Sequence, residues 1–220
     1  MPLTKFDGLE LPASADFHVH LRDGNMMKAV VPTIRQGGVN TVYVSIVLSE
    51  IRLHRSAHVA IQVMPNLVPP LTSASDAMAY KQRLREEDPN TNYLMTLYLH
   101  EKITPAVVKG AKAQGIVGIK SYPAGVTTNS SSGVLDYEVF YPVFRAMEQC
   151  GMVLNLHGEC PSDHGKNITI LNAESSFLPT LKSLHAEFPK VSHCDVDALK
   201  QGGLTSISIA QNRLGALHDP

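Results

Sequence analysis

Two histidines and an arginine occupy alternate positions in residues 15–24, Ala-Asp-Phe-His-Val-His-Leu-Arg-Asp-Gly. Side chains at positions i and i+2 of a β-strand point to the same face, so the imidazoles of His18 and His20 can reach a single metal ion. Arg22 follows on that face and offers a fixed positive charge to an anionic substrate. Because His-x-His triplets also occur without any metal, the pattern predicts a metal site only if further ligands accompany it.

A lysine in the apolar segment 116–122, Ile-Val-Gly-Ile-Lys-Ser-Tyr, is the second unusual feature. Lys120 in a buried strand must be paired, deprotonated or modified. Its neutral amine could take up carbon dioxide to form a carbamate, an oxygen ligand able to bridge two metal ions. The alternatives are pairing with a nearby carboxylate or extension of the side chain to the rim of the sheet.

His157 ends another apolar segment, 152–157, Met-Val-Leu-Asn-Leu-His. Alone, it is equally consistent with a core histidine bonded to a backbone carbonyl. Together with His18, His20 and Lys120 it completes a set of N, N, O and N donors that suits zinc. Two zinc ions bridged by the carbamate and a hydroxide would activate water and polarise a carbonyl, which predicts hydrolytic chemistry at an amide.

Short apolar runs alternate with amphipathic segments of helical length, the pattern of a parallel sheet with helical crossovers. We expect strands in 16–21, 41–44, 93–99, 116–122 and 152–157, and helices in 26–36, 75–85, 105–113, 137–149 and 173–188. The candidate residues fall where strands end, as active-site residues do in (β/α)8 barrels. The predicted fold class is therefore α/β, in one domain spanning residues 1–220, although a typical full barrel needs ~250 residues.

Composition favours a small-molecule partner. The chain has 19 basic and 20 acidic residues, so nothing indicates nucleic acid or an acidic membrane surface. Its cysteines, Cys150, Cys160 and Cys194, lack the spacing of a disulfide framework or a structural zinc site. Residues 1–15 contain no apolar signal segment, and no long apolar run follows, which predicts a soluble cytoplasmic protein.

Four stretches in combination resemble the dihydroorotase family of the amidohydrolase superfamily, in its single-function type. They are residues 16–24, Asp-Phe-His-Val-His-Leu-Arg-Asp-Gly; 64–72, Met-Pro-Asn-Leu-Val-Pro-Pro-Leu-Thr; 120–130, Lys-Ser-Tyr-Pro-Ala-Gly-Val-Thr-Thr-Asn-Ser; and 156–159, Leu-His-Gly-Glu. The resemblance runs from about residue 16 to 190 with one interruption. It implies a TIM-type (β/α)8 barrel and the reversible cyclisation of N-carbamoyl-L-aspartate to L-dihydroorotate in pyrimidine biosynthesis.

The resemblance also implies roles for particular residues. His18 and His20 would bind one zinc ion, carboxylated Lys120 would bridge two, and His157 would bind the second. Arg22 and Asn66 would hold the substrate carboxylate, and Thr127 and Thr128 would lie in a loop that closes over the substrate. Asn129 and Glu159 match the family pattern without an assigned role. The complete enzyme could be a homodimer.

Two parts of the family pattern are missing from the sequence: a histidine in a Glu-His-Cys-Thr-Thr type strand end, and a general-base aspartate. We therefore expect an incomplete barrel of about five of the eight strands, without catalytic activity. Residues 44–62 interrupt the pattern and 191–220 replace it, and both segments can be written with codons that mark intron edges. We hypothesise two translated introns, so His54, His58 and His193 are not counted as metal ligands.

Two alternative functions remain open. The chain could be another cyclic-amide hydrolase, such as a hydantoinase or an allantoinase, although the Arg22 and Asn66 pair and the Thr-Thr-Asn segment favour dihydroorotate. It could also be a non-catalytic protein of dihydroorotase type that binds an enzyme partner. Comparing the turnover of dihydroorotate with that of hydantoin distinguishes dihydroorotase from the first alternative. A stable complex with an enzyme partner, without catalytic activity, would indicate the second.

Overall fold

The computed structural model describes residues 16–36, 59–126 and 129–194. These residues form one parallel sheet of six strands in the order β1-β2-β3-β4-β5-β6. The strands are β1 (Asp16–Val19), β2 (Val59–Val63), β3 (Thr91–Tyr98), β4 (Gly118–Ser121), β5 (Val153–Leu156) and β6 (Ser192–Cys194). The helices are α1 (Gly24–Gln36), α2 (Ala74–Glu87), α3 (Pro105–Ala113), α4 (Tyr141–Cys150) and α5 (Ala173–Glu187), with short 3₁₀ turns η2 (Glu138–Phe140) and η3 (His164–Lys166).

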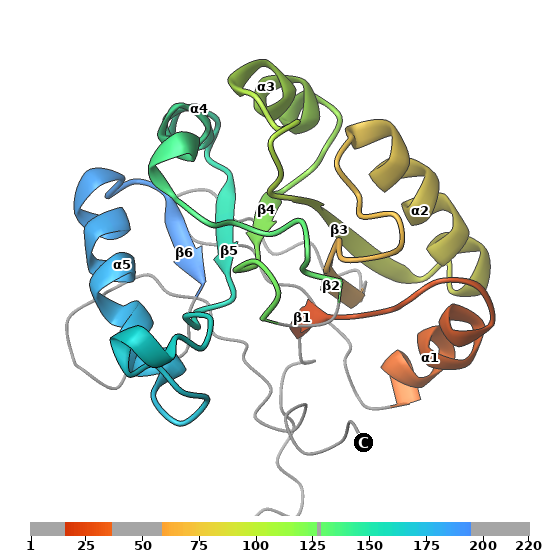
Figure 1. The fold of residues 1–220 in the computed structure, drawn as a ribbon. Helices are drawn as coiled ribbons and strands as arrows, with labels where there is room; N and C mark the ends of the chain where they lie inside the picture. Colours follow the sequence, from red (N-terminus) through yellow and green to blue (C-terminus); the bar gives the residue numbers. More distant parts are fainter. Residues whose placement is uncertain (1–15, 37–58, 127–128, 195–220) are drawn as a thin grey trace, which may run out of the picture.

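One helix follows each of the first five strands, and the helices lie along the outer side of the curved sheet (Figure 1). Strands and helices thus alternate as predicted, and the α/β class is confirmed. Since every strand pairs in parallel with its neighbours, the carboxyl ends of all six strands lie at one edge of the sheet. Side chains that follow the strands are therefore brought close together.

The strand register shows which side chains face the apolar core and which face the opposite side of the sheet. Leu97, Ile119 and Leu154 form one row across β3, β4 and β5, and all three are fully buried in the apolar core. The next row, Tyr98, Lys120 and Asn155, projects from the opposite face because side chains alternate along a strand. This second row is also buried, so the sheet carries polar groups on its inner face.

The helices begin and end where capping residues in the sequence predict. Thr104 accepts a hydrogen bond from the backbone N–H of Val107, and Pro105 occupies the first turn of α3, as N-capping predicts. Gly151 ends α4 in the left-handed conformation, which glycine adopts without steric cost. The remaining helices begin and end within a few residues of the predicted bounds.

One strand prediction lies outside the described residues, and the predicted number of strands needs correction. The expected strand at 41–44 is not among those residues, and the place between β1 and β3 is taken by β2, which begins inside the predicted insert 44–62. The expected count of five strands was too low, because β6 lies within the predicted aberrant tail 191–220. Parallel pairing uses backbone groups, so residues outside the family pattern can still extend a sheet.

Candidate metal and substrate site

His18 and His20 bring their ring nitrogens together where β1 ends. Their Nε2 atoms lie 3.2 Å apart. In a tetrahedral zinc site with Zn–N bonds of about 2.1 Å, two ligand nitrogens are about 3.4 Å apart. The spacing of the two nitrogens therefore fits binding of a single ion, as the His-x-His pattern predicts.

His20 is the residue around which the other candidate groups gather. Burial, followed by the positive charges of Arg22 and Lys120, lowers the pKa of His20 to about 4, and a hydrogen bond with the Asn66 side chain opposes this shift. His157 also contributes a small lowering of this pKa. At neutral pH the ring is uncharged and has a lone pair for a metal ion. The electrostatic couplings place all five side chains in one neighbourhood.

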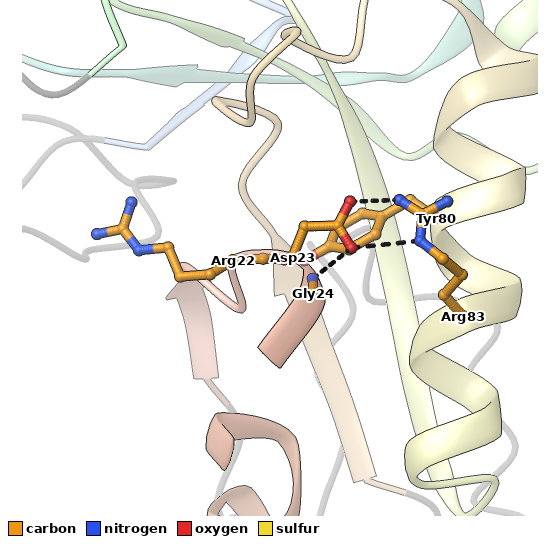
Figure 2. Close-up of polar contacts among 5 residues, drawn as sticks. All are labelled: Arg22, Asp23, Gly24, Tyr80 and Arg83. Carbon is orange, nitrogen blue, oxygen red and sulfur yellow. Dashed lines mark hydrogen bonds and ion pairs between the residues drawn. The ribbon is translucent and has the colours of Figure 1, made fainter. Parts of the chain in front are cut away.

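Arg22 turns the chain between β1 and α1. Its φ of 60° lies in the left-handed region. The next residue, Asp23, accepts a hydrogen bond from the backbone N–H of Gly24 and pairs with Arg83. Figure 2 shows the Arg22 side chain extending away from Asp23 and Arg83, which leaves its guanidinium out of that ion pair.

Lys120 is fully buried in β4. Its Nζ donates a hydrogen bond to the backbone carbonyl of Leu156 at 3.0 Å and lies 5.0 Å from the centre of the Tyr122 ring. Extension to the rim of the sheet is excluded, since the side chain has no exposed surface. The amine is instead held between β4 and the end of β5, next to His157.

His157 follows β5 and faces Glu159 and Tyr122. Its Nε2 lies 3.4 Å from Oε2 of Glu159, and its ring centre lies 5.9 Å from that of Tyr122. Tyr122 stacks in turn on Tyr98. His157 is therefore not simply bonded to a backbone carbonyl in the core, and Glu159 orients its ring.

Asn66 lies in the turn after β2 and is buried. Besides its side-chain contact with His20, its backbone carbonyl accepts a hydrogen bond from Nδ2 of Asn129 at 3.1 Å. This bond joins the segment after β4 to the turn after β2. Thr127 and Thr128, the predicted loop residues, lie outside the described part of the chain.

The polar atoms around Lys120 fit a further bound group. The hydroxyl of Tyr122 and both side-chain polar atoms of Asn155 are buried without a hydrogen-bond partner. Buried polar atoms normally have partners, so their position next to Lys120 suits a carbamate or metal-bound oxygen. Among the described residues, however, no three His, Cys, Asp or Glu side chains form a cluster ready for a metal ion. The set depends on Lys120 as a ligand.

His193 lies in β6, where its backbone pairs in register with Leu154. That position is three residues before His157 along β5, so the backbone of His193 is not level with the end of the strand.

Sequence reasoning missed Tyr80, Arg83, Tyr122 and Asn155. Tyr122 and Asn155 each stand two residues from a named candidate, Lys120 and His157, and strand alternation could have placed them on the same face. Tyr80 and Arg83 lie on α2, far along the chain from Arg22, and carry no sequence signal of their own.

No family model matches the chain. It is 46% identical over 203 residues to a "Probable dihydroorotase" from Schizosaccharomyces pombe, which covers 89% of this chain and 54% of that protein. The crystal structure of a Saccharomyces cerevisiae dihydroorotase in complex with 5-fluoroorotic acid superposes with a TM-score of 0.72 at 42% identity, covering 82% of this chain and 46% of that one.

An L-hydantoinase from Arthrobacter aurescens superposes with a TM-score of 0.60 at 16% identity, over 83% of this chain and 41% of its own. This second likeness shows the fold alone. The chain spans about half the length of the relatives it matches. Over most of its own 220 residues, the chain is thus related to the dihydroorotases, hydrolases of the amidohydrolase superfamily that act on cyclic amides.

Proposed function

We propose that this chain carries the metal-binding part of a dihydroorotase site. His18 and His20 would hold one zinc ion, His157 would hold a second, and carboxylated Lys120 would be a ligand to both. The single observation that carries the proposal is the geometry around His20: its Nε2 lies 3.2 Å from that of His18, and its buried ring lies near Lys120, Arg22, Asn66 and His157. Zinc bound there would supply an activated water and polarise the ring amide of L-dihydroorotate.

The residues beyond the metal ligands select an anionic substrate. Arg22 extends away from the Asp23 and Arg83 pair, so its guanidinium is available for the carboxylate of dihydroorotate. Asn66 adds an amide beside His20 and fixes the orientation of the bound molecule. In the same proposal Thr127 and Thr128 close over the substrate from the loop after β4.

Zinc binding tests the ligand set directly. We expect the purified chain, supplied with bicarbonate and zinc, to bind zinc tightly in equilibrium dialysis. His18→Ala and His20→Ala should each weaken this binding at least about 10-fold, the scale on which metal sites respond to altered ligands. His164→Ala, at an exposed histidine of η3, is the control and should leave zinc binding unchanged. Equal affinity in all three variants would contradict the proposed site.

A hydantoinase-type activity is the second candidate. The sequence leaves it open, but the likeness to a hydantoinase at 16% identity concerns the fold alone, whereas the identity to a dihydroorotase is 42%. Titration of the zinc-loaded chain with L-dihydroorotate and with hydantoin separates the two, because only dihydroorotate has a ring carboxylate for Arg22. We expect binding of dihydroorotate alone, and preference for hydantoin would favour the second candidate.

A further inference from the structure

The backbone of Arg22 is fixed by a helix that is distant in sequence. Tyr80 on α2 is fully buried, and its hydroxyl donates a hydrogen bond to the backbone carbonyl of Arg22. That carbonyl belongs to the residue whose φ is 60°. A non-glycine residue in this conformation is sterically unfavourable and persists only where surrounding contacts hold it.

A second contact from the same helix fixes the next residue. Arg83 donates two hydrogen bonds to Asp23, from Nε to Oδ1 at 3.3 Å and from Nη2 to Oδ2 at 2.7 Å. Asp23 Oδ1 also accepts the backbone N–H of Gly24 at 2.8 Å, at the start of α1. The guanidinium of Arg83 lies 5.2 Å from the centre of the Tyr80 ring, so the two α2 residues support each other.

These contacts determine where the Arg22 side chain can go. Figure 2 shows the Arg22 guanidinium on one side of the turn, with Tyr80, Asp23 and Arg83 on the other. Because Arg83 occupies both oxygens of Asp23, that carboxylate is satisfied and does not draw Arg22 back towards itself. The left-handed turn and the satisfied Asp23 together direct the Arg22 guanidinium away from α2.

We infer that Tyr80 and Arg83 are positioning residues that set the Arg22 guanidinium for the substrate carboxylate. The inference rests on the proposed function, since it needs Arg22 to bind that carboxylate. Neither α2 residue touches the substrate. Both act through the backbone of Arg22 and the side chain of Asp23, and neither contributes to zinc binding.

The test measures binding of L-dihydroorotate to the zinc-loaded chain by calorimetry. Tyr80→Phe removes one hydrogen bond and should weaken binding about 3- to 10-fold, the equivalent of a typical hydrogen bond. Arg83→Met should weaken binding by a similar factor, and Arg83→Lys should retain part of it because a lysine can still pair with Asp23. Zinc affinity should be unchanged in all three variants.

The chain offers a matched control for each substitution. Tyr93 is likewise fully buried and donates to a backbone carbonyl, that of Asp88 at 3.2 Å. Arg145 likewise pairs with a carboxylate, Glu187, and lies 5.2 Å from an aromatic ring centre, that of Phe188. Tyr93→Phe and Arg145→Met therefore remove equivalent contacts elsewhere in the fold, and neither should change dihydroorotate binding.

The outcomes separate failure of this inference from failure of the proposed function. If Arg22→Met binds dihydroorotate as well as the unmodified chain, or if the unmodified chain does not bind it, the proposed function is wrong. If Arg22→Met weakens binding but Tyr80→Phe behaves like Tyr93→Phe, the inference is wrong.

A second readout does not depend on ligand. The amide NMR signals of Arg22, Asp23 and Gly24 should shift in Tyr80→Phe and remain in place in Tyr93→Phe. Unshifted signals in Tyr80→Phe would overturn the inference whatever the binding result.

Discussion

Lys120 is the residue whose chemistry depends most on its surroundings. It has no exposed surface, its Nζ donates to the carbonyl of Leu156, and unpartnered polar atoms of Tyr122 and Asn155 lie in the same region of the sheet. Burial disfavours the ammonium form of a lysine, and the neutral amine is the form that reacts with carbon dioxide. In our proposal this amine adds carbon dioxide and releases a proton, and the resulting carbamate anion would be a ligand for the metal ions.

Carbamate formation gives a prediction at the scale of this residue. With ¹³C-labelled bicarbonate and zinc, the chain should show a carbamate signal by ¹³C NMR, and Lys120→Met should abolish it. Lys112→Met is the control, because Lys112 is an exposed lysine whose Nζ donates a hydrogen bond to the backbone carbonyl of Gly151. A carbamate signal that survives in Lys120→Met would assign the modification to another lysine.

In the segment between β4 and α4, the backbone at Gly133 packs directly against the backbone of residues 122–124. A Cβ at Gly133 would lie 2.4 Å from the carbonyl oxygen of Tyr122 and 2.9 Å from the backbone N of Ala124. The same carbonyl accepts a hydrogen bond from Val134 at 2.7 Å, so it cannot easily move. Glycine at position 133 thus lets this segment fold back on the residues that follow Lys120.

We therefore expect Gly133→Ala to lower the free energy of unfolding by about 1–3 kcal/mol, the usual cost of forcing extra volume into a packed site. Gly110→Ala is the control, because Gly110 is exposed in α3 and nothing lies within 4 Å of its added Cβ. That change should raise stability by about 0.5–1 kcal/mol through helix propensity. Urea unfolding of both variants checks the pair, and an equal effect in the two would contradict the steric argument.

Buried tyrosines on the sheet and on α2 make stability depend on alkaline pH. Burial raises the pKa of Tyr93 on β3 to about 12, against about 10 in an unfolded chain. Between these values the unfolded chain loses the phenol proton while the folded chain keeps it, so the free energy of unfolding falls as pH rises. The contribution of Tyr93 to the free energy of unfolding is complete below about pH 10 and lost by about pH 12. Burial also raises the pKa values of Tyr80 and Tyr122.

Urea unfolding of the metal-free chain between pH 9 and 11.5 measures this effect. Tyr93→Phe should reduce the slope of unfolding free energy against pH by up to about 1.4 kcal/mol per pH unit, the value for one proton. An unchanged slope in the variant would mean that Tyr93 ionises equally in the folded and unfolded chains.

At the scale of the whole molecule, the described part is six adjacent strands of a parallel sheet with their crossover helices. In (β/α)8 barrels the active-site residues come from the ends of several strands. In this chain the candidate groups lie on or directly after β1, β2, β4 and β5. No helix in the described ranges has the length and apolar character needed to cross a membrane. The candidate site residues lie towards the carboxyl edge of the sheet, whose outer face packs on the helices (Figure 1).

We predict that the 220-residue chain turns over dihydroorotate slowly. The Glu-His-Cys-Thr-Thr type strand end that the resemblance implies does not occur in the 220 residues, and no aspartate matches the implied general base. General-base catalysis typically contributes 10²–10⁴ in rate. We expect the 220-residue chain to bind zinc but to convert dihydroorotate to N-carbamoyl-L-aspartate at least about 100-fold more slowly than the S. cerevisiae dihydroorotase. Chromatographic measurement of product decides this, and comparable rates would contradict it.

The origin of residues 44–62 and 191–220 remains a hypothesis at the level of the transcript. Sequencing the messenger RNA across the codons for Tyr43 to Val63 and beyond Lys190 tests it. Codons other than those of the predicted splice edges would refute the intron interpretation, and a dominant spliced form would support it. In the structure, β2 and β6 begin in these segments and still pair in the sheet.

Sequence by itself determined the α/β class, most of the helices and the candidate residues that end β1, β4 and β5. Apolar periodicity, helix caps and turn residues are local signals. Short motifs such as His-x-His can also be recognised without knowing which distant residues contact them. The places of β2 and β6 in the sheet, and the contacts of Tyr80 and Arg83 with the turn at Arg22, became apparent only from the three-dimensional structure. The two α2 contacts join residues 58 and 60 positions apart through hydrogen bonds. The strand pairings likewise join segments that are distant along the chain, and no local pattern encodes either kind of contact.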